Sequence, residues 1–308
     1  MSVRRNPLSL NDGPTLIGVD PSLLQLSDGR HLAWTEMGDP AGYPVFAFHG
    51  TPGDRGQILV DTRPALTVGV RMIAPDRPGC GASTWRRGRT FRGWTRDVAE
   101  LADHLGVERF AVLGISGGGP YAAACARFLP DRVSAAALVS GVACVAEPGS
   151  ETGMMAANRL FARLGRHLPA ANAVLFGLIF VFGRRAPTRV LPLLMNSMPA
   201  VDAGVLARPE VLSLFLSMLA DASATAGRAA AHDFRLFAHD WGFRLEDIRV
   251  PVQVWQGDVD VNVPLAHAQC QAAAIPGAAL HAFPGEGHLM FVDHFEEILQ
   301  ELLDSVMA

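Results

Sequence analysis

The chain contains no lysine, since all 26 of its basic Lys and Arg positions are arginine. A preference for GC-rich arginine codons is the simplest origin of this bias. Its chemical consequence holds whatever the origin. Schiff-base catalysis on a carbonyl substrate or pyridoxal phosphate needs a lysine amine. P-loops and protein kinases also need a lysine to reach the phosphates. The sequence therefore excludes these classes of enzyme.

Cysteine is also scarce, with four residues in 308. They are scattered, without the C-x-x-C spacing of zinc sites and redox motifs, and we interpret them as free, mostly buried thiols. We accordingly expect neither a metal nor a cofactor. The cysteines are Cys80, Cys125, Cys144 and Cys270.

The chain also lacks a long apolar run, because the longest covers only residues 173–183, whereas a bilayer span needs about 20 residues. The first residues carry Arg4 and Arg5 but no apolar stretch that would make a secretory signal. We therefore expect a cytoplasmic protein without an integral membrane segment.

Net charge is −4 and hydrophobic residues make up 49% of the chain. This balance argues against disorder and gives no global basic field for nucleic acid. We expect a folded protein that acts on a small molecule and has no nucleic-acid partner. Oligomeric state is left open.

Short, continuous apolar runs alternate with helical patterns through the first half of the chain, which indicates a parallel sheet covered by helices on both faces. A hairpin at the sheet edge is expected at 23–26 and 31–36. The other predicted strands are 43–48, 70–74, 110–113, 133–140, 250–255 and 279–283. The predicted helices are 95–105, 118–128, one starting at 264, and 291–306.

This pattern stops near residue 144 and returns near 250. The sequence thus predicts a core formed by residues 1–143 and 244–308, with a helical insertion over 144–243. Proline residues are expected to break the insertion into short helices. They are Pro169, Pro187, Pro192, Pro199 and Pro209.

The insertion holds 8 of the 16 Phe and 5 of the 10 Met residues. Two interpretations remain open. Small helices need large side chains to pack together, and Phe and Met also suit an adaptable apolar pocket. The candidates for such a pocket are Met154, Phe176, Phe180 and Met218.

Residues 114–118 read G-I-S-G-G and fit the pattern G-x-S-x-G at a junction between a predicted strand and a predicted helix. At such a junction a sharp turn exposes the serine hydroxyl. Ser116 is therefore the candidate nucleophile. A glycine-rich helix start that binds phosphate is the alternative.

A serine hydroxyl needs a base, and His288 in the loop after the last predicted strand is the candidate. The imidazole in turn needs an orienting carboxylate. Asp260 and Asp258 both follow the preceding strand, and spacing alone does not choose between them.

An oxyanion needs backbone N–H donors. Gly117 directly follows the candidate nucleophile, and Thr51 lies in the loop after the strand at 43–48. Thr51 is preferred there because Pro52 has no N–H. We expect these two N–H groups to form an oxyanion hole.

Together these motifs resemble the α/β-hydrolase fold superfamily, in its form with a helical cap. The resemblance rests on H-G-T-P-G at 49–53, D-R-P-G-C-G-A-S at 76–83, the elbow at Ser116, G-x-x-D-x-x-x-P at 257–264, and Gly287-His288. It implies an eight-stranded, mostly parallel sheet with an inserted lid. It also favours Asp260 as the triad carboxylate and makes 76–83 a structural loop near the site.

Relatives within the superfamily limit the reaction. The H-G-x-P loop is similar to that of epoxide hydrolases and haloalkane dehalogenases, but those enzymes use an Asp where this chain has Ser116. Proline iminopeptidases share a similar loop, but they carry Trp at the position of Gly117 and need acidic cap residues. The insertion has seven acidic residues and nine Arg, so it is not rich in acid.

We therefore predict a serine hydrolase of carboxylesterase type that acts on a lipophilic substrate. An aminopeptidase, a carbon–carbon bond hydrolase and a cofactor-free haloperoxidase remain alternatives, and a ligand receptor is a further one. Five arginines after the 76–83 loop indicate a solvated helix start, or a surface that steers an anionic substrate. They are Arg86, Arg87, Arg89, Arg92 and Arg96.

Overall fold

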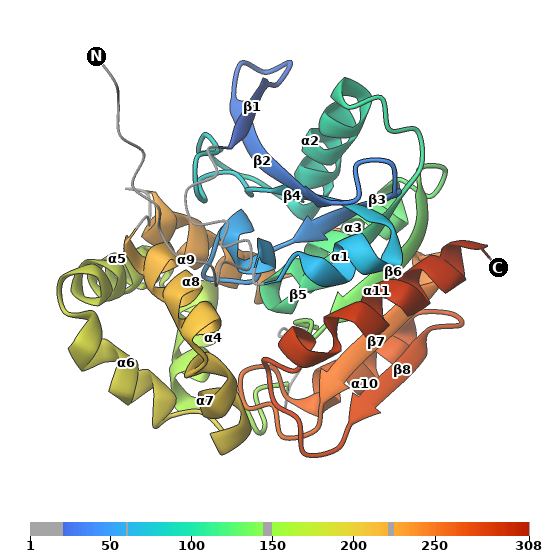
Figure 1. Cartoon of the computed structure of the whole chain (residues 1–308). Coiled ribbons are helices and arrows are strands. Elements are labelled where there is room, and N and C mark those ends of the chain that lie inside the picture. The colour runs from blue at the N-terminus through green and yellow to red at the C-terminus, as the bar shows by residue number, and fades with distance from the viewer. Residues whose placement is uncertain (1–20, 60, 144–149, 221–224, 308) are drawn as a thin grey trace, which may run out of the picture.

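The computed structural model describes residues 21–59, 61–143, 150–220 and 225–307. An eight-stranded sheet runs through the molecule in the order β1-β2-β4-β3-β5-β6-β7-β8 (Figure 1). The strands are β1 (Ser22–Gln25), β2 (His31–Gly38), β3 (Tyr43–Phe48), β4 (Val70–Pro75), β5 (Phe110–Ile115), β6 (Val133–Val139), β7 (Val252–Gly257) and β8 (Ala279–Phe283).

Only the first two strands depart from a parallel arrangement. β1 pairs antiparallel with β2, and β2 pairs antiparallel with β4, which makes the predicted hairpin one edge of the sheet. All pairs from β4 through β8 are parallel. The carboxyl ends of β3, β5, β7 and β8 therefore meet along one edge, where ligands bind in open α/β sheets.

Helices cover both faces of the sheet, as predicted. Apolar side chains of α2, α3 and α10 pack on one face, and those of α1 and α11 pack on the other. Strands β3 to β7 are buried between these layers, which explains their continuous apolar sequences, whereas the edge strands β1 and β8 are largely exposed. These helices are α1 (Arg63–Val68), α2 (Phe91–His104), α3 (Gly119–Phe128), α10 (Leu265–Ala274) and α11 (Phe291–Met307).

In the described part of the segment between β6 and β7, six further α-helices form what we call the helical insert, which lies beside the sheet (Figure 1). The helices are α4 (Ala156–His167), α5 (Pro169–Arg185), α6 (Pro187–Met195), α7 (Ala200–Leu206), α8 (Pro209–Ala220) and α9 (Ala226–Phe237). The prediction that five prolines separate these helices is wrong for one of them. Pro192 lies inside α6, where it removes one hydrogen bond but does not end the helix. The other four stand at helix starts, where a missing N–H costs nothing.

Candidate active site

Ser116 stands directly after β5 and before α3, in a sharp turn. Its φ is +54°, a left-handed conformation that a non-glycine residue seldom adopts. The turn is held by tight packing on either side. A Cβ at Gly114 would collide with the carbonyl of Gly118, and a Cβ at Gly118 would collide with the carbonyl of Phe48. The two glycines of G-x-S-x-G are thus needed for β5 and α3 to approach each other.

His288 and Asp260 come together from the loops after β8 and β7. His288 Nδ1 lies 2.7 Å from Asp260 Oδ2, and the carboxylate makes the Nδ1–H tautomer the donor. The same oxygen accepts from Gln256 Nε2 at 2.8 Å. Oδ1 accepts from the backbone N–H groups of Asn262 and Val263 at 2.7 and 2.9 Å. The carboxylate is therefore held by four donors, and its position sets the orientation of the imidazole.

The rival carboxylate lies elsewhere. Asp258 is exposed and accepts from the Gly285 N–H at 2.7 Å, so it supports the turn after β8. Of the two acids that spacing could not separate, Asp260 is the one that contacts His288.

The charge state of His288 follows from these contacts. Burial disfavours the imidazolium, but the charge and hydrogen bond of Asp260 and the charge of Asp202 outweigh burial, so that the pKa of His288 is raised. The proton-bound form of this side chain is thus stabilised, as a base that receives a proton during a reaction requires.

Asp202 in α7 of the helical insert binds the backbone of the loop that carries His288. Its Oδ2 accepts from the His288 N–H at 3.0 Å, and its Oδ1 accepts from the Leu289 N–H at 2.8 Å. A side chain at Gly287 would collide with this carboxylate. The sequence offered no signal for this role, because Asp202 is one acid among seven in the insertion and lies 86 residues from His288.

The loop after β3 holds Thr51 close to Ser116. Gln57 supports this loop, since its Oε1 accepts from the Gly50 N–H and its Nε2 donates to the Pro52 carbonyl, both at 2.8 Å. Among the described residues, the Thr51 N–H donates to no acceptor. A Cβ at Gly117 would meet the Thr51 side chain, so the two predicted oxyanion positions adjoin each other.

Behind this loop lies a fully buried ionic cluster. Asp233 of α9 pairs with Arg89 at 2.7 Å and with Arg77 at 3.1 Å, and it accepts hydrogen bonds from the Tyr121 and Thr51 hydroxyls at 2.5 and 2.7 Å. Burial alone would raise the pKa of Asp233, but Arg89 and Arg77 lower it strongly. The carboxylate therefore stays ionised. It ties the helical insert to Thr51.

Arg77 completes the link between this cluster and the loop. Its guanidinium donates to the carbonyls of His49 and Gly50 and to the Thr51 hydroxyl. Its neighbour Asp76 is buried and accepts from Arg55 and from the Ala82 N–H. The 76–83 segment thus supports the loops around Ser116.

Ser116 and His288 both line one cavity of about 160 Å³ between the sheet edge and the helical insert. Its wall is largely apolar, and none of the described residues that line it is Asp, Glu or Arg. From the insert come Leu206, Val211, Leu214, Phe215 and Met218; from the core come Gly50, Thr51, Pro52, Gln57, Ile115, Leu289, Phe291 and Val292.

The whole architecture matches one known family. The model of the alpha/beta hydrolase fold family covers residues 43–295. The chain belongs to the alpha/beta hydrolase fold family. The resemblance inferred from the sequence motifs, and the eight-stranded, mostly parallel sheet that it implies, are thereby confirmed.

Relatives of this alpha/beta hydrolase include esterases. It is 29% identical over 249 residues to a pimeloyl-[acyl-carrier protein] methyl ester esterase of Aromatoleum aromaticum, which covers 78% of this chain and 89% of the relative. A probable proline iminopeptidase of Streptomyces coelicolor is 30% identical, but over 118 residues, or 34% of this chain and 35% of the relative. The fold is also that of an esterase from Exiguobacterium antarcticum (TM-score 0.66, 20% identity), with 93% of this chain and 99% of that one covered.

The four pocket candidates of this hydrolase lie in different places. Met218 lines the cavity beside Ser116, whereas Phe176 packs in a small core inside the helical insert with Phe161 and Phe234. Phe180 lines a second, much smaller cavity of about 10 Å³. Met154 is buried and lines neither.

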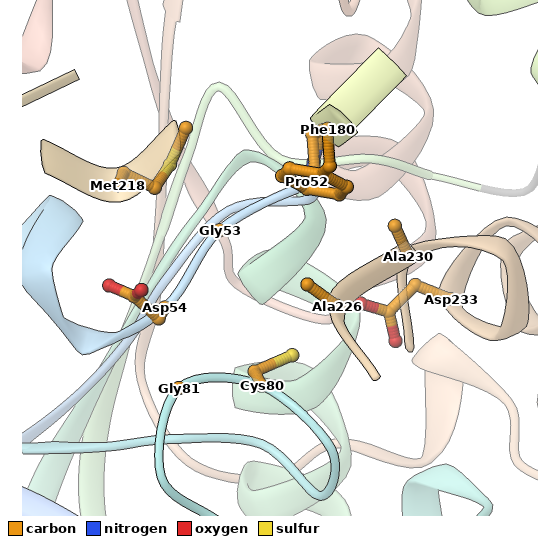
Figure 2. A pocket seen from close by; sticks show the side chains of 10 residues that line it. All are labelled: Pro52, Gly53, Asp54, Cys80, Gly81, Phe180, Met218, Ala226, Ala230 and Asp233. Carbon is orange, nitrogen blue, oxygen red and sulfur yellow. The ribbon is translucent and has the colours of Figure 1, made fainter. Parts of the chain in front are cut away.

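This small cavity is just large enough for a water molecule. Figure 2 shows Met218 and Asp233 on opposite sides of it, with Pro52 between them. Met218 and Pro52 line both the small cavity and the larger one, so they lie between the two.

The arginines after the 76–83 loop do not act as one group. Arg89 is buried against Asp233, Arg86 lies 3.5 Å from Asp97, and Arg92 stacks over Phe128. Arg87 lines an open hollow beside α9. None of the five lines the cavity that contains Ser116.

Within the described ranges, no three His, Cys, Asp or Glu side chains are grouped so that they could hold a metal ion. In the same part of the chain, no helix has the length and apolar character needed to cross a membrane.

Proposed function

We propose that this protein is a serine esterase, of carboxylesterase type, with Ser116, His288 and Asp260 as its triad. The observation that carries the proposal is a single apolar cavity bordered by a half-buried serine with a positive φ and by a histidine hydrogen-bonded to a buried carboxylate. The helical insert acts as a cap over a core formed by residues 1–143 and 244–308. The enzyme works in the cytoplasm and needs no cofactor.

In the reaction, Ser116 Oγ attacks the ester carbonyl carbon while His288 Nε2 takes the hydroxyl proton. The N–H groups of Thr51 and Gly117 donate to the oxyanion that forms. The C–O bond then breaks, and the alcohol leaves with the proton from His288. A water molecule attacks the acyl-enzyme with His288 as base, and the acid is released. Asp260 holds the imidazole throughout, and Asp202 positions its backbone.

Cavity size and chemistry support an ester with one compact apolar group. An engineered apolar cavity of about 150 Å³ in another protein accepts benzene. The cavity beside Ser116, at about 160 Å³, is similar in size. We therefore propose an acyl or alcohol group of about four to six carbons, which makes the substrate moderately lipophilic rather than fatty.

The same cavity argues against the aminopeptidase alternative. A substrate amine would need a carboxylate, and no Asp or Glu among the described residues lines the cavity. The two buried acids of the helical insert are occupied, Asp202 by backbone N–H groups and Asp233 by Arg77 and Arg89.

A series of nitrophenyl esters from acetate to dodecanoate tests the proposal. Each methylene that the cavity buries contributes about 0.8 kcal/mol, so kcat/KM should rise roughly fourfold per carbon and then level off near hexanoate. Equal rates with acetate and hexanoate would refute the apolar pocket. Faster turnover of an aminoacyl-naphthylamide would indicate an aminopeptidase, and faster turnover of a vinylogous diketone a carbon–carbon bond hydrolase.

A further inference from the structure

Helix α5 presents an apolar face to the outside of the molecule. Val174, Leu178 and Phe182 follow one another at four-residue spacing, so they lie on one side of the helix, and their exposed fractions are 65%, 49% and 60%. The opposite side of α5 packs inward, where Phe176 is buried. A surface helix in water normally carries polar residues on its outer side. Packing within the fold therefore does not explain the apolar side chains on the outer side of α5.

Segments of the helical insert next to α5 in the sequence expose further large hydrophobic side chains. Of the 11 exposed large hydrophobic side chains among the described residues, six lie between residues 160 and 193. Besides the three on α5 they are Leu160, Leu168 and Leu193, which is 73% exposed. Figure 1 shows α5 and α6 at the outer edge of the helical insert, away from the sheet. An exposed apolar helix face such as that of α5 marks an interaction surface.

The charged side chains of α5 and α6 are all positive. Arg184 and Arg185 end α5, and Arg189 lies in α6, while neither helix contains an Asp or Glu. In the described part of the chain, none of the three arginines forms an ion pair. The chain as a whole has a net charge of −4, so this cationic region runs against the overall charge.

These features distinguish between possible partners. A second copy of the chain placed face to face would bring one set of arginines close to another, without acids on α5 or α6 to balance them. An anionic lipid surface instead suits both the apolar side chains and the arginines, because Leu and Phe insert among the acyl chains while Arg pairs with the headgroups. An outer helix face with Leu and Phe beside Arg is typical of interfacial membrane helices.

We propose that the outer face of α5 and α6 docks the enzyme on an anionic lipid bilayer. The inner side of α5 bears Phe180, which shares the small cavity with Met218, and Met218 borders the cavity with Ser116. Docking therefore brings the bilayer next to the helices that form the pocket wall. The consequence that apolar esters reach this pocket from the bilayer rests on the proposed esterase function, whereas lipid binding itself does not.

Sedimentation of the whole protein with vesicles tests the docking. The wild type should bind vesicles of phosphatidylcholine with phosphatidylglycerol, and bind vesicles of phosphatidylcholine alone much less. The double variant Leu178→Asp and Phe182→Asp should lower the partition coefficient at least about tenfold. Leu23→Asp with Leu66→Asp, at exposed sites on β1 and α1, is the matched control and should bind as the wild type does.

The arginines are tested separately. Arg184→Gln, Arg185→Gln and Arg189→Gln together should reduce binding to the anionic vesicles by roughly fivefold per arginine, and added salt should remove the difference. Arg96→Gln, Arg109→Gln and Arg249→Gln remove the same charge at exposed sites in α2 and before β5 and β7, and should leave most of the binding intact.

Three results would overturn the proposal: no binding of the wild type to anionic vesicles, equal binding by the aspartate variant, or equal loss with both arginine triples. A dimer in ultracentrifugation that the aspartate variant dissociates, without vesicle binding, would assign the face to a second copy. Hydrolysis of soluble nitrophenyl butyrate is measured in parallel and should not change in the aspartate variant. An inactive wild type that still binds vesicles would refute the esterase function and leave the docking in place.

Discussion

Replacing Asp260 by asparagine tests the proposed triad most sharply, because the structure leaves no place for an amide NH₂ group there. Oδ1 accepts from two backbone N–H groups, and Oδ2 accepts from Gln256 and His288. Whichever way the asparagine turns, its NH₂ faces two donors. If it faces His288, the imidazole loses its partner and adopts the wrong tautomer.

The expected loss is large. In a Ser-His-Asp hydrolase the corresponding change lowers kcat about 10⁴-fold, which corresponds to roughly 5.5 kcal/mol of transition-state stabilisation. The unsatisfied donors also cost about 1–3 kcal/mol of folding stability each. Activity on nitrophenyl butyrate should therefore be measured on protein shown to be folded by circular dichroism and thermal unfolding.

Asp258→Asn is the matched control, two residues away. Asp258 is exposed and accepts one hydrogen bond, from Gly285, which an asparagine carbonyl can accept equally well. Its kcat should stay within about twofold of the wild type. Retention of a tenth of the activity by folded Asp260→Asn, or a large loss with Asp258→Asn, would refute the assignment.

Three further predictions concern His288, the elbow and the buried cluster. Because the pKa of His288 is raised, kcat/KM should increase with pH through a midpoint above the ordinary histidine value of about 6.5. In Asp202→Asn the midpoint should move to lower pH, and an unmoved midpoint would limit Asp202 to a purely structural role. Gly118→Ala should destroy activity because its Cβ collides with the Phe48 carbonyl. Gly177→Ala adds its Cβ in open space on α5 and should raise Tm. The same activity and the same Tm in both variants would contradict the packing argument. Tyr121→Phe removes a donor to buried Asp233 and should lower the free energy of unfolding by about 1–3 kcal/mol in urea titration; an unchanged midpoint would show that the bond contributes little.

The parallel sheet was predictable because buried strands leave a strong local signal. The continuous apolar run at 43–48 matches β3 in both bounds. The strand predicted at 279–283 also matches β8 in both bounds, although β8 is a largely exposed edge strand. The predicted ends of strands were less accurate where a backbone turn, rather than a change of residue type, ends the strand. The strand predicted at 110–113 continues to Ile115, as far as the turn at Ser116. The helix break predicted at Pro192 is wrong because one missing N–H does not end a helix whose other residues keep it in place.

The candidate site was only partly predictable, for a physical reason. Ser116, Asp260 and His288 stand at strand ends with recognisable spacing, so their loops could be expected to meet. Asp202 and Asp233 act across 86 and 182 residues of sequence and through tertiary contacts, on His288 and on Thr51 respectively. Nothing in the local sequence distinguishes these two acids from the exposed acids of the insertion.

The wall of the cavity could not be predicted either. Phe176 and Met218 are both large apolar residues in helices of the insert. Phe176 nevertheless packs inside the helical insert, whereas Met218 borders the cavity beside Ser116. Only the way in which α5, α8 and α9 pack against one another decides which side chain faces the cavity.

Covalent labelling of Ser116 tests the central claim most directly. A fluorophosphonate should react with the folded protein and add its phosphonyl group to the peptide that contains Ser116, as peptide mass spectrometry would show. Ser116→Ala should abolish the label, and Asp258→Asn should leave its rate unchanged. A label on another residue, or no label on an enzyme that hydrolyses nitrophenyl butyrate, would contradict the account.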